Sequence, residues 1–126
     1  MTFRLIIAGS RNVTVSPKDL FTQLDLARLF WPVTHVVSGC ARGADRLGEH
    51  YARSRNLSVD QFPADWDTFG KSAGPRRNKQ MLEHSDALFA IWDGKSRGTQ
   101  HMINITRTAG KPVRIYNTVT QEGYDL

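Results

Sequence analysis

The sequence is poor in the features that mark secreted, membrane-bound or metal-stabilised proteins. It has one cysteine, Cys40, so an intrachain disulfide is excluded, and Cys40 is interpreted as a small buried side chain. No pair of histidines or cysteines stands at zinc-ligand spacing, and we expect neither a metal ion nor a cofactor. No apolar run reaches the roughly 20 residues that cross a bilayer, and residues 1–9 lack a signal-peptide cleavage site. We therefore expect a cytoplasmic protein without membrane contact.

Positive charge is in moderate excess. The chain has 17 Lys and Arg against 12 Asp and Glu, which gives a formal net charge of +5. A basic balance favours anionic partners such as nucleotides, phosphates or nucleic acid, although a merely solvated basic surface has the same composition. The length suits one domain with one core, which we assign to the whole of residues 1–126.

Short apolar runs alternate along the chain with segments of helical periodicity. The expected strands cover residues 3–8, 35–37, 58–62, 87–92 and 113–116. The expected helices cover residues 17–31, 44–55, 75–84 and 99–109. Residues 63–74 are expected to be irregular, and the tail, residues 117–126, gives no assignment. This order predicts an α/β fold, a single Rossmann-like domain whose five-stranded, mainly parallel sheet has helices on both faces.

Three polar loops follow strands and carry the residues that we expect to bind a ligand. The carboxyl ends of parallel strands meet at one edge of a sheet, so these loops are expected to lie close together. The first loop contains Gly9, Ser10 and Arg11. The glycine allows a ligand to approach the backbone, and the other two residues offer a hydroxyl and a guanidinium group. The pattern is weak alone, because many strands end in such a turn.

The second loop, residues 38–45, leads into a helix through small residues. Ser38, Gly39 and Gly43 leave backbone N–H groups open at the helix start, where the helix dipole favours an anion. Arg42 adds positive charge there, although close packing of strand against helix is an alternative reason for the small residues. Asp45 can hold ribose hydroxyls or simply complement the helix dipole. The loop is neither a G-x-G-x-x-G fingerprint nor a Walker A loop.

The third loop and the helix start that precedes it add further polar groups. Basic side chains are unfavourable at a helix start, so Arg77 and its neighbour Asn78 indicate a functional role. Trp66, just upstream, can stack on a base or pack on the domain surface. The third loop suits a phosphate unless its polar groups are only solvated; its candidates are Asp93, Gly94, Ser96, Arg97, Gly98 and Thr99.

These loops resemble those of the SLOG superfamily, a Rossmann-like group that includes the Lonely Guy (LOG) enzymes, and more closely the YspA-like branch of that group. The resemblance rests on residues 7–11, 38–47, 62–67, 70–78 and 92–99, which together extend over nearly the whole chain. It implies a ligand that is a nucleotide, a nucleotide-sugar or a related compound.

LOG enzymes cleave the N-glycosidic bond of nucleoside monophosphates with an arginine in an Arg-Lys-x-x-Met stretch and a glutamate in a Pro-Gly-Gly-x-Gly-Thr-x-x-Glu stretch. The resemblance places Arg77 at that arginine, whereas Met102 stands where the glutamate is expected. We expect His101 not to reach the same point, because successive residues of a helix point about 100° apart. The resemblance thus implies that phosphate contacts are kept and the catalytic acid is missing. The remaining catalytic candidates are Arg77, Asp45 and Asp93, with Asp65 and Asp67 as further carboxylates.

The leading hypothesis is the binding of a phosphorylated nucleotide or nucleotide-sugar, for sensing or sequestration, in a crevice at the carboxyl edge of the sheet. The second hypothesis is a hydrolase of N-glycosidic bonds that acts on the same ligands with a different carboxylate. The third is the binding of single-stranded nucleic acid, for which no helix-turn-helix, zinc-finger or RNA-recognition motif is present. Because the resembling proteins assemble as dimers or larger, we also expect a homo-oligomer, with the apolar residues 29–31 as a contact face.

Overall fold

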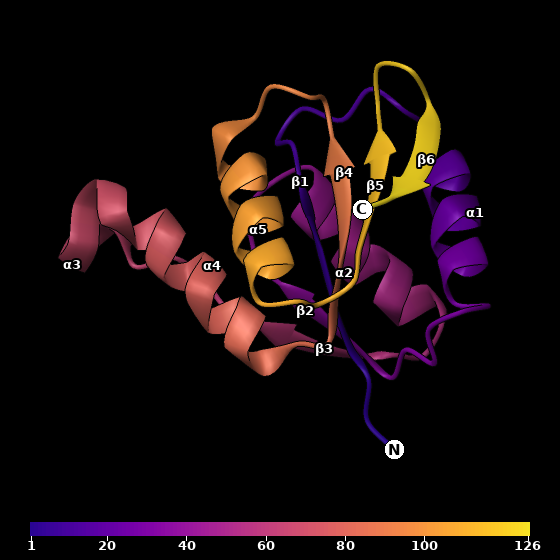
Figure 1. The fold of residues 1–126 in the computed structure, drawn as a ribbon, viewed down its shortest axis with the longest axis horizontal. Helices are drawn as coiled ribbons and strands as arrows, with labels where there is room; N and C mark the ends of the chain where they lie inside the picture. The colour runs from indigo at the N-terminus through magenta and orange to yellow at the C-terminus, as the bar shows by residue number, and fades with distance from the viewer.

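Six strands form one sheet in the computed structural model, which describes residues 1–126. They are β1 (Arg4–Gly9), β2 (His35–Ser38), β3 (Ser58–Gln61), β4 (Ala87–Trp92), β5 (Val113–Asn117) and β6 (Glu122–Asp125). Their order across the sheet is β3-β2-β1-β4-β5-β6. The first five strands are parallel, as predicted, and β6 pairs antiparallel with β5 (Figure 1). The chain thus builds the sheet outward from β1 in one direction and then from β4 in the other.

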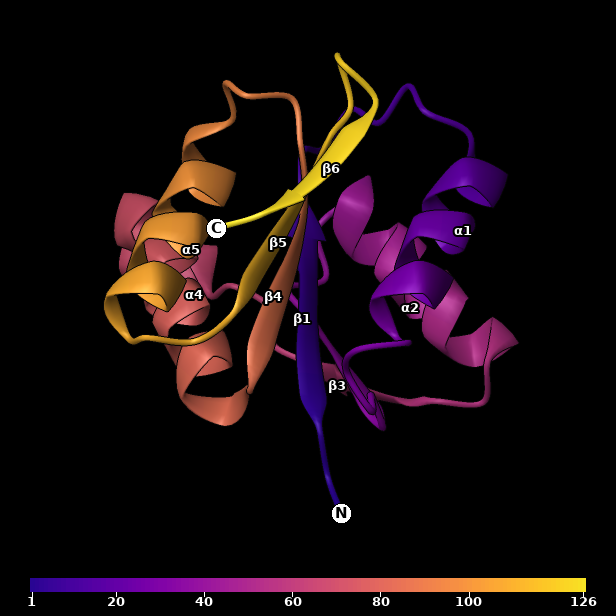
Figure 2. The same ribbon diagram turned by 45° about the vertical axis from the view of Figure 1, so that its right-hand side comes forward.

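Helices cover both faces of the sheet, which confirms the prediction. Two of them, α1 (Pro17–Ala27) and α2 (Ala44–Ser54), lie on one face, and α4 (Ala73–His84) and α5 (Arg97–Thr108) lie on the other (Figure 2). The short α3 (Trp66–Phe69) and a 3-10 turn at Gly70–Ser72 stand at the amino-terminal end of α4, away from the sheet (Figure 1). None of the helices combines the length and the apolar character that a span across a bilayer requires.

Alternate residues of the central strands belong to two separate core layers. Leu5 and Ile7 of β1 pack in the layer that α1 and α2 cover, whereas Ile6 and Ala8 pack in the layer that α4 and α5 cover. All four side chains are buried. A strand covered on both faces needs an apolar residue at every position, so β1 is an unbroken apolar run in the sequence.

The sheet has six strands instead of the expected five, because the tail forms β6. The side chain of Asn117, at the end of β5, accepts hydrogen bonds from the N–H groups of Val119 and Thr120 and so turns the chain back. Arg114 of β5 then forms an ion pair with Asp125 of β6. Every residue of β6 is exposed, so the strand lacks the apolar alternation by which a sequence reveals a half-buried strand.

The first helix is shorter than expected and ends at Ala27 rather than at residue 31. Its buried residues are Leu20, Leu24 and Ala27, as the helical spacing predicts. Beyond Ala27 the amides of Leu29 and Phe30 bond to carbonyls only three residues earlier, which tightens the chain into turns. The other main differences are that α4 and α5 each begin two residues earlier than predicted and that residues 63–74 contain α3.

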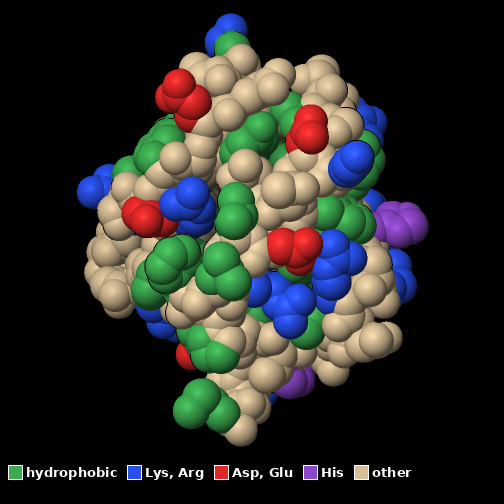
Figure 3. Space-filling view, turned by 90° about the vertical axis from the view of Figure 1, so that its right-hand side faces the viewer, with side chains coloured by type: hydrophobic (Ala, Val, Ile, Leu, Met, Phe, Trp, Pro, Cys, Tyr) green, Lys and Arg blue, Asp and Glu red, His purple; other side chains and the backbone are tan.

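The side of the molecule around α1 and β6 exposes apolar side chains among charged ones (Figure 3). Leu26, Phe30 and Leu126 are 45%, 84% and 49% exposed, and all three line a hollow of about 540 Å³. This hollow lies close to the predicted contact face at residues 29–31. The homo-oligomer itself stays a prediction.

The contact between β1 and β4 at Gly9 leaves no room for a side chain. A Cβ atom on Gly9 would collide with the carbonyl group of Ile91 and with the side chain of Ala44. We expect Gly9→Ala to lower the free energy of unfolding by about 1–3 kcal/mol, the usual cost of overfilling a packed interior. Gly98→Ala is the matched control, because no atom lies within 4 Å of a Cβ at that position. Urea unfolding followed by circular dichroism measures both variants, and equal stability would contradict this role of Gly9.

Candidate functional site

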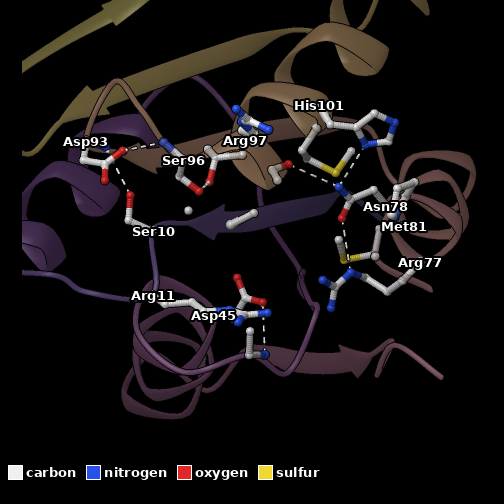
Figure 4. Close-up of a pocket in the computed structure, with 18 of the residues that line it drawn as sticks. Ser10, Arg11, Asp45, Arg77, Asn78, Met81, Asp93, Ser96, Arg97 and His101 are labelled. Atoms are coloured by element: carbon white, nitrogen blue, oxygen red, sulfur yellow. Dashed lines mark hydrogen bonds between the residues drawn. The ribbon is translucent and has the colours of Figure 1, made fainter. Parts of the chain in front are cut away.

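A crevice of about 630 Å³ lies at the carboxyl edge of the sheet, between the loops after β1 and β4 and the first turns of α2, α4 and α5 (Figure 4). The strand order reverses at this point, where open α/β sheets bind their ligands. Twelve of the predicted binding residues line the crevice: Gly9, Ser10, Arg11, Asp45, Trp66, Arg77, Asn78, Asp93, Ser96, Arg97, Gly98 and Thr99.

A smaller cavity of about 340 Å³, which we call the side hollow, adjoins the crevice. Two further predicted residues, Gly39 and Arg42, line the side hollow and not the crevice. The two cavities share four lining residues: Arg11, Ala41, Trp66 and Arg77. Fourteen of the predicted residues therefore lie around one connected surface at the carboxyl edge of the sheet.

Three predicted binding residues line neither cavity, and each has a structural role instead. The hydroxyl of Ser38 is buried and donates to Glu49 Oε2 at 2.6 Å. Gly43 has a φ of 79°, and a Cβ there would collide with the carbonyl oxygen of Arg11. Gly94 also has a positive φ, 83°, in an exposed turn after β4. These residues shape the loops that carry the site.

Glu49 holds the second loop in place although it resembles an ordinary surface acid in the sequence. Its side chain is buried on the inner side of α2 and accepts hydrogen bonds from Ser38, Gln61, Arg46 and Arg53. Ser38 in turn accepts from the N–H of the second residue after it, at 3.1 Å. The loop between β2 and α2 is therefore anchored at both ends by one carboxylate.

Asp45 presents a buried carboxyl group to the crevice. Its side chain is 6% exposed, and Oδ2 accepts a hydrogen bond from the N–H of Ala41 at 3.1 Å. Burial raises the pKa of Asp45 to about 6, although the Ala41 amide and the charge of Arg77 act in the opposite direction. The group can therefore change its protonation state near neutral pH.

Arg77 lies opposite Asp45 and is held by neutral groups. Its terminal nitrogen donates to the carbonyl oxygen of Gly39, and its Nε donates to Asn78 Oδ1 at 3.1 Å. A Cβ on Gly39 would stand 2.6 Å from Arg77 and 2.8 Å from Asp45, so only glycine lets both side chains approach this strand end. Burial lowers the pKa of Arg77, and the charge of Asp45 partly offsets this effect.

Asn78, in the second turn of α4, links this helix to the first turns of α5. Its Nδ2 donates to the carbonyl oxygen of Gly98 at 3.3 Å and to His101 Nδ1 at 3.1 Å. His101 and Met102, successive residues of α5, both line the crevice. That their side chains do not reach the same point stays a prediction. The hydrogen bond from Asn78 draws the imidazole ring toward α4, whereas Met102 is buried (Figure 4).

Asp93 shapes the third loop with its carboxylate. Oδ1 accepts hydrogen bonds from the N–H groups of Ser96 and Lys95, each at 2.8 Å, and these bonds hold the pKa of Asp93 below its ordinary value. The Asp93 N–H donates to Ser10 Oγ at 3.2 Å. The carboxylate thus fixes the backbone of the third loop.

The region that we expected to be irregular forms one edge of the crevice. Asp65 Oδ1 accepts from the N–H of Thr68 at 3.1 Å and caps the start of α3, so an aspartate at position 65 was a usable signal for this helix. Trp66 packs over Gly74, with its ring 3.3 Å from the position of a Cβ there. The indole is 48% exposed, so it combines packing on the surface with an open face toward the crevice.

The starts of α4 and α5 are electropositive. Neither helix has a side-chain cap or an acidic residue in its first turn. At α4 the N–H of Ala73 bonds to the carbonyl of Gly70, and before α5 the carboxylate of Asp93 accepts from the N–H groups of Lys95 and Ser96, which leaves the amides of the first turn of α5 uncapped. No carboxylate forms an ion pair with any of the arginines of the two cavities, which are Arg11, Arg42, Arg77 and Arg97. No cluster of His, Cys, Asp or Glu is suited to hold a metal ion. The site offers positive charge, N–H groups and hydroxyls.

Sequence reasoning missed several residues of the crevice lining. Met81 follows Arg77 by one helical turn, so the shared helix face was a usable signal. Asn12 directly follows Arg11 in the first loop. Nothing in the sequence shows that the buried apolar residues Ala8 and Met102 would line the crevice. The missed residues are Ala8, Asn12, Ala41, Gly74, Pro75, Met81, His101 and Met102.

Comparison with known proteins agrees with the resemblance noted in the sequence. Residues 3–69 match the sequence model of the family described as "YspA, cpYpsA-related SLOG family". The chain is also 37% identical over 84 residues to the Gene 61 protein of Mycobacterium phage D29, an alignment that covers 62% of this chain and 67% of that protein. No solved structure gives a significant match. The matched family segment runs from β1 to α3 and includes the first two loops of the site.

The buried carboxyl of Asp45 predicts a pH-dependent stability. Its pKa is about 6 in the folded protein against an ordinary 3.8, so ionisation opposes folding above pH 6, and this penalty disappears as the pH falls from 6 to 3.8. We expect Asp45→Asn to raise the free energy of unfolding at pH 8 by on the order of 3 kcal/mol and to change it little near pH 4. Urea unfolding at pH 8, 6 and 4 measures the effect.

Asp93→Asn is the control, because it is expected to change the free energy of unfolding at pH 8 in the opposite direction to Asp45→Asn. The folded state lowers the pKa of Asp93, so its ionised form contributes stability that is present at pH 8 and is lost as the pH falls toward the acid range. The control variant should therefore be less stable than the natural protein at pH 8. An Asp45→Asn variant with the same stability difference at pH 8 and pH 4 would show that Asp45 does not titrate in the expected way.

Proposed function

The chain belongs to the YspA, cpYpsA-related SLOG family, and on this basis we propose that it binds a phosphorylated nucleotide or nucleotide-sugar in the crevice. Family membership supports a nucleotide-related ligand in general terms. A phosphorylated ligand is favoured by one observation: several arginines line the crevice and its side hollow, and none of them forms an ion pair. The volume of about 630 Å³ is within the usual range of roughly 300–1,000 Å³ for small-molecule sites.

We propose the first turn of α5 as the phosphate site. Residues 96–99 all line the crevice, and the uncapped amides of this turn are typical anion donors. Gly98 leaves open space where other residues would place a Cβ, so a phosphate can approach the backbone closely. The side chain of Arg97 is exposed and has no ion-pair partner, which leaves it available to the same phosphate.

Arg97→Ala is expected to weaken the binding of nucleoside 5′-monophosphates. Removal of a charge-assisted contact costs roughly 1.5–3 kcal/mol, which corresponds to a loss of affinity of about 10- to 150-fold. Arg107→Ala is the matched control, since Arg107 is an exposed arginine near the other end of the same helix. Thermal shift against a panel of nucleotides and nucleotide-sugars identifies the ligands, and calorimetry then compares the variants.

Equal affinity of the two variants would contradict the phosphate site at α5. Stabilisation by none of the small ligands would contradict nucleotide binding altogether. In that case, binding of single-stranded oligonucleotides with a steep salt dependence would favour the nucleic-acid hypothesis, because release of counterions from many phosphates produces that dependence.

The second candidate function is an enzyme that acts on the same ligands. Asp45 favours it, because a carboxyl with a pKa of about 6 on the crevice surface can give a proton to a leaving base or take one from water. Met102 offers neither a proton nor a negative charge at the position where the resembling LOG enzymes have glutamate. An enzyme of this kind would therefore use Asp45 as its carboxyl group, whereas the LOG enzymes use a glutamate at the position of Met102.

We expect the protein to release no free base from nucleoside monophosphates by the LOG route. The positive charge that develops on the sugar during this cleavage needs a nearby carboxylate, and the thioether of Met102 does not supply one. Chromatography of reactions with adenosine and cytokinin-riboside monophosphates measures the released base. Release above a no-protein control that persists in Asp45→Asn would contradict this expectation, whereas release lost in Asp45→Asn would support the second candidate.

A further inference from the structure

We propose that the side hollow is a second phosphate subsite, so that the natural ligand is a nucleotide with two separate phosphate groups. One phosphate lies at the start of α5, and the other lies in the side hollow, on the far side of Arg77. This inference rests on the proposed nucleotide-binding function and names the class of nucleotide. The inference is based on one observation: three arginines surround a small cavity, and no carboxylate lines that cavity.

The charge of the side hollow is of one sign. Arg11, Arg42 and Arg77 line it, and the other lining residues are neutral: Gly39, Cys40, Ala41, Pro63, Ala64 and Trp66. Every acid among the lining residues of the two cavities belongs to the crevice, where Asp45 and Asp93 lie. A cavity with three cationic groups and no anion is complementary to a doubly charged phosphate.

Arg77 is partly buried and held in place by hydrogen bonds, unlike a solvated arginine on the surface. Hydrogen bonds from two of its nitrogens to Gly39 and Asn78 fix the guanidinium group, and both acceptors are uncharged oxygens. The side chain is partly buried, and Asp45 acts on it without an ion pair. The charge of Asp45 offsets only part of the effect of burial on Arg77, so a further anion beside this partly desolvated cation is favourable. The phosphate that we assign to the side hollow supplies this anion.

The two proposed phosphate sites stand at opposite ends of one path. Arg97 and the α5 loop lie across the crevice from Arg11 and Arg77 (Figure 4). Arg11 and Arg77 belong to both cavities, so a ligand that leaves the crevice toward the side hollow passes between them. The sugar of a nucleotide would occupy the crevice between the two sites. This arrangement fits phosphates on different positions of one ribose, or a phosphate that links two nucleosides.

The test compares matched ligands that differ by one phosphate. For each of the four common bases, calorimetry measures the dissociation constants of the nucleoside 5′-monophosphate and the nucleoside 3′,5′-bisphosphate. We expect the bisphosphate of the preferred base to bind at least tenfold more tightly, in line with a single charge-assisted contact. A 5′-phosphorylated dinucleotide of the same base shows whether the second phosphate is a terminal group on the ribose or the link between two nucleosides. Tight binding of the dinucleotide indicates that the subsite accepts a linking phosphate, and tight binding of the bisphosphate alone indicates a terminal one.

Two variants remove the side hollow by different means. Arg42→Ala removes an exposed charge that lines only this cavity, and Ala64→Trp fills its volume. Both should reduce the bisphosphate-to-monophosphate affinity ratio to near one. Arg97→Ala should weaken both ligands by a similar factor and keep the ratio, and Arg107→Ala should change neither affinity. Unfolding midpoints confirm that each variant is folded, and Arg42→Ala decides the test if Ala64→Trp does not fold.

Three outcomes would overturn the inference, and they are distinguishable from one another. If the natural protein binds both ligands within twofold, there is no second phosphate subsite, although nucleotide binding stands. If the preference for the bisphosphate persists in both side-hollow variants, the second phosphate binds elsewhere. If no ligand of any pair binds and no nucleotide-sugar of the thermal-shift panel binds either, the proposed function fails and this inference fails with it.

Discussion

The close approach of β1 and β4 at Gly9 determines where the candidate site lies. The two strands touch so closely that no side chain fits between the Gly9 backbone and Ile91, and Ser10 continues the contact by donating from its N–H to the Ile91 carbonyl at 2.9 Å. From this shared end, β1 leads to α1 on one face of the sheet and β4 leads to α5 on the other. The two loops must therefore separate, and the crevice is the space between them. The hydrogen bond from the N–H of Asp93 to Ser10 Oγ joins the two loops where they leave the strands.

Arginine has two distinct roles in this fold, and the difference lies in the groups that hold each side chain. Arg46 and Arg53 pair with the buried carboxylate of Glu49, so the negative charge of Glu49 is compensated within the protein. Arg77 is positioned by the carbonyl of Gly39 and the amide oxygen of Asn78, which orient a guanidinium group without cancelling its charge. The first arrangement stabilises a loop. The second preserves a positive potential inside the crevice, at a cost in desolvation that the folded domain tolerates.

The layout of the sheet could be predicted from the sequence because buried parallel strands are unbroken apolar runs that end in polar loops. The convergence of those loops followed from the same pattern. The roles of individual residues did not follow, because nothing in the sequence distinguishes Gly39 from Gly43. In the fold, Gly39 admits the side chains of Arg77 and Asp45, whereas Gly43 has a positive φ and lies against a carbonyl of the first loop. Ser38 and Glu49 were similarly hidden, since only the fold brings a helix acid beneath a strand end. The fully exposed β6 carried no apolar pattern at all.

The ends of the sheet affect how two copies of the chain can meet. An edge strand exposes unpaired N–H and C=O groups and can recruit a strand from another molecule. Here β3 and β6 are the edges, and each has only four residues. Glu122 and Asp125 stand at the two ends of β6, so an antiparallel pairing of β6 with its copy would bring like charges together. A short edge strand with an acid at each end, as in β6, opposes continuous growth of the sheet into a larger β-structure.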